Sequence, residues 1–139
     1  MAGRFGGDVS CEEAWRALAG TEIAVLVDVR TRAEWAYVGL PDLSSLKRPV
    51  LQVEWQSFPG GERNPNFAGE VIAKGVKPEQ PVYLLCRSGV RSKSAAEVLA
   101  ARGYTTYNIA DGFEGQIDPA GHRGVRNGWK VAGLPWKQS

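Results

Sequence analysis

The chain has 139 residues, 43% of them hydrophobic and 23% charged, so it can form one folded domain with a core and is too apolar for a disordered protein. Its 17 lysine and arginine residues nearly balance its 15 aspartate and glutamate residues, and a net charge of +2 argues against a polyanionic partner such as a nucleic acid. No run of about 18 apolar residues is present, which excludes a membrane-spanning helix.

The first predicted elements are a helix and a buried strand. Ser10 can cap the free amides of a helix and Glu13 can return the hydrogen bond, which is the capping-box pattern. We expect this helix to end near Gly20. Residues 23–27 form a continuous apolar run that ends at Asp28. Such a run is typical of a strand covered on both faces, as in a parallel sheet.

A second capping box follows directly after this strand. Thr31 and Glu34 have the required spacing, so we expect a short helix here and place Arg30 at the junction of strand and helix. Residues 49–53 predict a second strand. Residues 54–66 contain two prolines and two glycines, and these breakers predict a loop.

The second half of the chain continues the alternation of helices and strands. Residues 66–74 predict a weaker helix, and residues 81–85 predict another continuous apolar strand. Residues 92–102 show the clearest helical period and are followed by Gly103, a natural C-terminal stop. The face of this helix that we expect to point inward consists of Ala95, Val98, Leu99 and Arg102. Residues 105–109 predict a short final strand.

Strands and helices therefore alternate up to residue 109, which predicts an α/β fold: a small parallel sheet flanked by helices on both faces. After the last strand the periodicity stops. We expect a tail laid over the domain and anchored by Phe113, Trp129 and Trp136. The chain is then a single domain over residues 1–139, in which residues 116–139 are a C-terminal extension packed on it.

One stretch between the last two predicted strands carries chemistry, and it reads Cys86-Arg87-Ser88-Gly89-Val90-Arg91-Ser92. In parallel α/β sheets, ligands bind outside the carboxyl ends of strands, which is where this order places Cys86. Backbone amides of the turn can converge as an anion-binding nest, and Gly89 can take the positive φ that a nest needs. Arg87 and Arg91 add positive charge without a carboxylate in the stretch. We therefore expect the loop to favour the thiolate form of Cys86.

A cysteine flanked by leucines is more often a small buried hydrophobe than a nucleophile. The two arginines favour the nucleophile here, because a purely structural turn gains nothing from two cations beside a thiol. Cys11 and Cys86 match neither a zinc nor a redox-pair spacing, and no secretory signal is visible before Ser10. We expect two free thiols in a reducing cytoplasm.

Other candidate residues are weaker. Cys11 lies at a helix start without a cationic neighbour nearer than Arg16, so we expect a half-buried structural cysteine rather than a resolving one. His122, the only histidine, is expected at the surface or packed in the tail, because a thiolate activated by amides and arginines needs no base. Trp55 and Phe58 can either wall the site or fill the core.

The stretch from Cys86 to Ser92 resembles the active-site loop of the rhodanese superfamily. The resemblance covers about residues 8–115. It also rests on three further segments: Val27-Asp28-Val29-Arg30 with Glu34, Gly103-Tyr104, and Asp111-Gly112-Phe113. The chain departs from the family in one segment, where a Gly-His-Ile-Pro-Gly-Ala-like sequence is replaced by Val38-Gly39-Leu40-Pro41-Asp42-Leu43.

The length of the loop separates two chemistries within this group. Sulfur-transferring members resemble C-x4-R, whereas phosphatase-like relatives carry C-x5-R around a bulkier phosphate. Four residues separate Cys86 from Arg91, and the residue before Cys86 is Leu85, where tyrosine phosphatases typically have histidine. Both features favour sulfur. The resemblance thus implies a thiosulfate sulfurtransferase with Cys86 as nucleophile and residues 87–92 as the substrate-binding loop.

The resemblance also implies that Asp28, Arg30 and Glu34 support the loop through hydrogen bonds. The sulfur would travel as a persulfide on Cys86, from a small anionic donor such as thiosulfate to cyanide in an assay and to a thiol or thioredoxin-like protein in the cell. No metal, organic cofactor, nucleic acid or membrane is expected. Two alternatives stay open: a phosphatase or arsenate reductase with the same Cys-Arg loop, and a non-catalytic persulfide carrier or interaction module.

Overall fold

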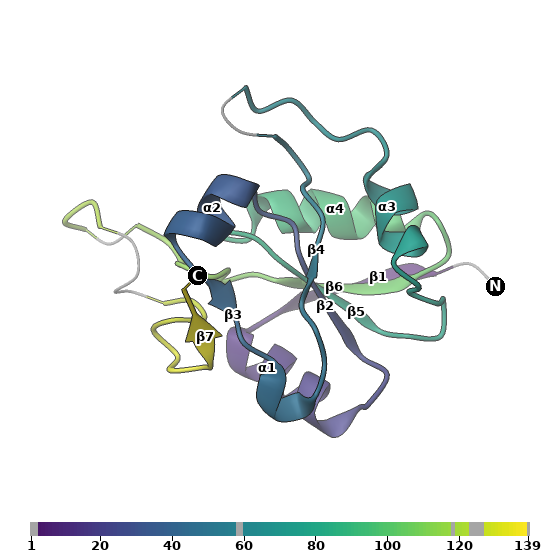
Figure 1. The fold of residues 1–139 in the computed structure, drawn as a ribbon, viewed down its shortest axis with the longest axis horizontal. Helices are drawn as coiled ribbons and strands as arrows, with labels where there is room; N and C mark the ends of the chain where they lie inside the picture. Colours follow the sequence, from purple (N-terminus) through teal and green to yellow (C-terminus); the bar gives the residue numbers. More distant parts are fainter. Residues whose placement is uncertain (1–2, 58–59, 118, 123–126, 139) are drawn as a thin grey trace.

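The computed structural model describes residues 3–57, 60–117, 119–122 and 127–138. A five-stranded sheet with the strand order β1-β6-β5-β2-β4 forms its centre, and each neighbouring pair is parallel (Figure 1). This topology confirms the predicted fold class. The strands are β1 (Arg4–Val9), β2 (Val25–Asp28), β4 (Leu51–Gln52), β5 (Val82–Leu85) and β6 (Thr105–Ile109).

Helices cover both faces of the sheet, with α3 and α4 on one side and α1 on the other (Figure 1). The helices are α1 (Cys11–Gly20), α2 (Arg32–Tyr37), α3 (Phe67–Ala73) and α4 (Val90–Ala100), with a short 3-10 turn η1 (Ser44–Leu46). Both predicted capping boxes are present, at Ser10 for α1 and at Thr31 for α2. Among the described residues, no helix is long and apolar enough to cross a bilayer.

The central position of β5 in the sheet explains why its sequence is continuously apolar. Val82 and Leu84 belong to the core under α3 and α4, whereas Tyr83 and Leu85 belong to the core under α1. Because successive side chains of a strand point to opposite faces, a strand buried on both faces needs apolar residues at every position. The end of β5 and the following residue, Cys86, therefore lie in a buried environment.

The sequence prediction was wrong about several boundaries. The predicted strand at 49–53 is only two residues long, and α4 begins at Val90, two residues before the expected start. Arg102 is exposed and does not lie on the inward face of α4. Arg102 follows the end of α4 at Ala100, so the helical period no longer sets its direction.

Strand β1 was not predicted at all, because Arg4–Val9 contains two glycines and no apolar run. These glycines fit their places: a Cβ at Gly6 would lie 2.3 Å from the ring of Tyr107, and Gly7 has a φ of 106°. The pairing of β1 with β6 shifts register between Phe5 and Asp8. The strand is thus identified by its backbone pairing with β6 rather than by a hydrophobic pattern of its own.

Two aromatic side chains that follow β6 belong to the core on the α1 side of the sheet. Phe113 and Trp129 are fully buried, and Trp129 contacts Trp15 of α1 edge to face. Farther on, β7 (Trp136–Lys137) pairs antiparallel with β3 (Leu40–Pro41), a small sheet that was not predicted. The segment that departs from the rhodanese pattern is therefore the one to which the C-terminal residues bind.

Candidate active site

Cys86 follows β5 at the carboxyl edge of the sheet and lines a surface cavity of about 540 Å³, although the residue is only 1% exposed. The loop supplies five of the lining residues: Cys86, Arg87, Ser88, Val90 and Arg91. The other walls come from α2 with the residues on either side of it, from Gln56, Ser57 and Gly61, and from Glu114. The carboxyl ends of β2 and β5 thus converge on one pocket, as expected for a parallel sheet.

The sulfur of Cys86 receives the amide N–H of Gly89, with N and Sγ 3.1 Å apart. Gly89 takes a φ of 96°, as the sequence analysis expected, and an added Cβ would lie 2.2 Å from the carbonyl oxygen of Ala110. Both the backbone conformation and the available space therefore require glycine here. An N–H directed at the sulfur favours a negative charge on it.

Ser92 is fully buried and is not among the residues that line the cavity. Its hydroxyl oxygen is 3.2 Å from the Sγ of Cys86 and 2.5 Å from Oδ1 of Asn108. A hydroxyl has one proton, so Ser92 can donate to only one of these acceptors at a time. Asn108 donates its own Nδ2 protons to the carbonyl of Gly89 and to Asp8.

The sequence analysis missed Asn108 and Asp8. The one available signal was a polar residue inside the predicted strand at 105–109, where a buried amide must find partners. Its partners come from β1 and from the loop, two segments that only the tertiary structure brings together.

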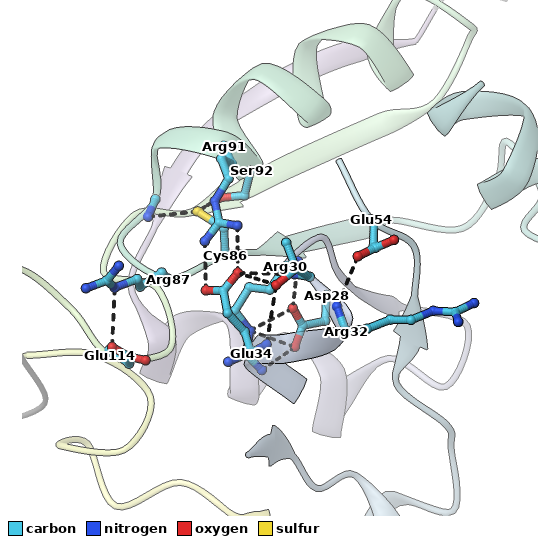
Figure 2. A network of polar contacts seen from close by, with 12 residues as sticks. Asp28, Arg30, Arg32, Glu34, Glu54, Cys86, Arg87, Arg91, Ser92 and Glu114 are labelled. Atoms are coloured by element: carbon cyan, nitrogen blue, oxygen red, sulfur yellow. Dashed lines mark hydrogen bonds and ion pairs between the residues drawn. The ribbon is translucent and has the colours of Figure 1, made fainter. Parts of the chain in front are cut away.

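Both arginines of the loop are paired with carboxylates from other segments, which corrects the expectation of unopposed positive charge. Arg91 donates to both oxygens of Glu34 in α2, at 2.7 and 2.9 Å (Figure 2). Arg87 lies 3.4 Å from the carboxylate of Glu114 and remains 47% exposed. The lining of the cavity therefore carries two positive and two negative side chains.

The ion pair between Glu34 and Arg91 shifts the pKa of both groups. Burial tends to raise the pKa of Glu34, but the hydrogen bonds and charge of Arg91 outweigh it and hold this pKa below its ordinary value. The hydrogen bonds that Arg91 donates to Glu34, together with the negative charge of Glu34, also raise the pKa of Arg91. Glu34 thus bonds directly to the loop, as a support residue must.

Asp28 and Arg30 bond to each other and to the segment at Gly39 rather than to the loop. They form a fully buried ion pair, in which Nη2 of Arg30 donates to Asp28 at 2.7 Å and to the carbonyl of Gly39 at 2.7 Å (Figure 2). The guanidinium of Arg30 also lies over the ring of Phe113, 4.3 Å from its centre. These contacts fix the segments on either side of the site, and neither residue contacts the 86–92 loop by a hydrogen bond that the structure records.

Among the remaining candidates, Trp55 and His122 do not line the cavity at Cys86. Trp55 is buried in the core against Phe67, and Phe58 lies outside the described residues. His122 is exposed, as expected. Within the described part of the chain, no cluster of His, Cys, Asp and Glu could hold a metal ion.

Cys11 is fully buried rather than half-buried. Its Sγ–H donates to the carbonyl of Gly112 at 3.3 Å. Burial, with the nearby charges of Asp111 and Glu12, raises the pKa of Cys11 to about 12. Both cysteines are free thiols.

Comparison with known proteins places the chain in a family. A family model described as the STR4 middle domain matches residues 6–139, and so includes the C-terminal extension. The crystal structure of Rv0390 from M. tuberculosis superposes with a TM-score of 0.89 and 50% identity, covering 98% of this chain and 100% of that chain. Protein RC0915 of Rickettsia conorii is 38% identical over 94% of this chain and 96% of its own length.

A third relative carries a functional name. The thiosulfate sulfurtransferase GlpE of Actinobacillus succinogenes is 29% identical over 92% of this chain and 87% of its own length. The match thus extends well beyond the loop around Cys86.

Proposed function

The chain belongs to the STR4 middle domain family and to the rhodanese-like superfamily, and from this premise we propose that it is a thiosulfate sulfurtransferase acting through Cys86. The proposal rests on one observation: Cys86 lines the cavity, and its sulfur accepts a hydrogen bond from the N–H of Gly89 at the head of α4. A named thiosulfate sulfurtransferase among the relatives supports the same chemistry.

In the first half-reaction the Cys86 thiolate attacks the outer sulfur of thiosulfate. A bond forms between the two sulfurs, the S–S bond of thiosulfate breaks, and sulfite leaves with the electron pair. The product is a Cys86 persulfide that keeps one negative charge. The N–H of Gly89 and the end of α4 lie where they can stabilise that charge.

In the second half-reaction an acceptor nucleophile attacks the outer sulfur of the persulfide. Cyanide gives thiocyanate in an assay, and a thiol or thioredoxin-like protein is the acceptor in the cell. The bond between the two sulfurs breaks, and Cys86 leaves as a thiolate ready for the next cycle. Because both halves share one covalent intermediate, the kinetics are ping-pong.

The two arginines take different parts in this mechanism. Arg87 lines the cavity, is 47% exposed, and is held by Glu114 only at 3.4 Å, so it can turn toward an anionic donor. Arg91 donates both of its hydrogen bonds to Glu34, and its charge therefore acts from a fixed place. The backbone of residues 87–92 forms the rest of the binding loop.

Intact-mass measurement after incubation with thiosulfate tests the proposal. The wild-type protein gains one sulfur atom, about 32 Da, and loses it on addition of cyanide. Cys86→Ser gains nothing, whereas Cys11→Ser gains the same mass as wild type. An unchanged wild-type mass, or an equal gain in Cys86→Ser, contradicts the proposal.

Two further assays, with a protein persulfide as donor and with an aryl phosphate as substrate, separate the alternatives. Fast loading from a protein persulfide with little turnover of thiosulfate indicates a carrier, and turnover of an aryl phosphate indicates a phosphatase-like enzyme. We propose further that the protein works in the reducing cytoplasm, which keeps both cysteines free.

A further inference from the structure

The peptide unit between Ser88 and Gly89 is held at both of its ends. Its N–H, on Gly89, donates to the Sγ of Cys86 at 3.1 Å. Its C=O, on Ser88, accepts a hydrogen bond from the side-chain amide Nε2 of Gln116, also at 3.1 Å. In a planar trans peptide the N–H and the C=O point in opposite directions. Whatever fixes the carbonyl of Ser88 therefore aims the N–H at the sulfur.

This peptide has an alternative orientation available to it. Gly89 has a φ of 96° and a ψ of −5°, the values of the third residue of a type II turn. Rotation of the preceding peptide by about half a turn gives a type I turn instead, and glycine tolerates both conformations. In the rotated form the carbonyl of Ser88 would face the sulfur and oppose a negative charge on it. The reactive loop thus needs a contact that selects one orientation.

Gln116 is itself held in a single orientation by Asn127. The backbone N–H of Gln116 donates to Oδ1 of Asn127 at 2.8 Å, and Nδ2 of Asn127 donates to the side-chain oxygen of Gln116. Asn127 also reaches Asp111, at 3.4 Å. Because the oxygen of the Gln116 amide is occupied by an N–H donor, its nitrogen must face Ser88.

We propose that Gln116, oriented by Asn127, is a positioning residue for Cys86: it selects the orientation of the Ser88–Gly89 peptide whose N–H faces the sulfur. The inference rests on the proposed function in taking Cys86 as the reactive group. It adds that the C-terminal extension, to which both residues belong, is part of the active site.

The rate at which iodoacetamide alkylates Cys86 tests this inference without any sulfur donor. Gln116→Met keeps the length of the side chain and removes the hydrogen bond, so we expect the rate to fall about two- to tenfold, the effect of one neutral hydrogen bond. The matched control is Gln80→Met. Gln80 also donates its Nε2 to a backbone carbonyl, that of Ile23 at 3.0 Å, but it lies before β5, at the opposite end of the strand. We expect its rate to equal that of wild type.

Asn127→Asp supplies a second variant that leaves Gln116 in place. The new carboxylate oxygen faces the side-chain oxygen of Gln116, so the amide of Gln116 turns over and presents its oxygen to Ser88. We expect a loss similar to that of Gln116→Met, and no additional loss when the two substitutions are combined. In both variants the amide resonance of Gly89 moves away from its wild-type position, because this N–H no longer points steadily at the sulfur.

Wild-type alkylation rates and an unchanged Gly89 resonance in folded Gln116→Met would overturn the inference. If that variant does not fold, the same readouts in Asn127→Asp decide. Additive losses in the double variant would also overturn it, since the two residues would then act separately. A wild-type protein that takes no sulfur from thiosulfate contradicts the proposed function alone, because alkylation does not depend on that chemistry.

Discussion

The two cysteines of this chain lie at the heads of two helices, are almost equally buried, and have opposite chemical environments. Cys11, the first residue of α1, is 0% exposed, and Cys86, just before α4, is 1% exposed. The sulfur of Cys11 donates its proton to the carbonyl of Gly112, whereas the sulfur of Cys86 accepts the N–H of Gly89. Two equally buried thiols can thus have opposite hydrogen-bond partners: a carbonyl group favours the protonated form of Cys11, whereas an N–H group faces the sulfur of Cys86.

The N-terminal ends of α1 and α4 also differ in their capping and charge. The first turn of α1 is closed by the capping box of Ser10 and Glu13, which adds acidic charge beside Cys11. Gly89 at the head of α4 has no side chain to cap the helix, so its amides stay available to the loop. Burial and the charges of Asp111 and Glu12 raise the pKa of Cys11, whereas two arginines and two glutamates line the cavity at Cys86.

The largest effect on activity is expected when Cys86, but not Cys11, is replaced. Cys86→Ser removes the nucleophile, and we expect kcat/KM with thiosulfate and cyanide to fall at least about a thousandfold. Cys11→Ser keeps a buried donor for the carbonyl of Gly112 and is expected to retain most activity. Steady-state kinetics on both folded variants check this, and equal losses would erase the distinction between the two sites.

A smaller effect is expected when the amides around Cys86 are moved while the cysteine is kept. One glycine inserted between Gly89 and Val90 lengthens the loop to the phosphatase-like spacing, which carries N–H groups away from a single sulfur. We expect sulfur transfer to fall about a hundredfold, because donors act only within about 2.7–3.1 Å of the charge. A weak aryl-phosphatase activity is the expected gain. Unchanged thiosulfate kinetics would show that loop size does not set the substrate class.

The next prediction concerns the charge pair that braces the reactive loop. Glu34→Gln removes the charge opposite Arg91, and we expect a loss of about 2 kcal/mol in the free energy of unfolding at neutral pH. The pKa of Glu34 is lowered by folding, so its contribution is present above the unfolded value and is lost as the pH falls through the folded one. The free energy of unfolding, measured with urea, should therefore fall more steeply with decreasing pH in the wild-type protein than in Glu34→Gln. Parallel pH profiles would exclude the pair as a source of stability.

The smallest effect belongs to the structural thiol and appears only in alkali. Folding raises the pKa of Cys11 from 9.0 to about 12, so the unfolded chain releases this proton at lower pH than the folded one. Stability contributed by the thiol is complete below about pH 9 and decreases above it, by at most about 1.4 kcal/mol per pH unit. Between pH 9 and 10.5 the free energy of unfolding should fall less in Cys11→Ser than in wild type. Identical slopes would show that Cys11 ionises freely in the folded protein.

Local patterns predicted much of the fold because the physics behind them is local. Two capping boxes, at Ser10 and Thr31, and the apolar run of β5 correctly located helices and a central strand. Strand β1 was not predicted because its glycine-containing backbone is held by β6. The β3–β7 pair was not predicted because its two strands lie far apart in the chain. Neither leaves a periodic signal in its own residues.

The sequence by itself determined where the Cys86 loop lies, because the order of strand, Cys86, glycine-containing turn and helix is contained in one short segment. It also indicated Glu34 through the family resemblance, but it did not pair Glu34 with Arg91. Only the tertiary structure decided the charges and contacts around the sulfur: Glu34, Glu114 and Gln116 approach the loop from other elements. Hydrogen bonds and ion pairs depend on distances of a few ångströms between atoms, and for residues far apart in the chain those distances are set by folding.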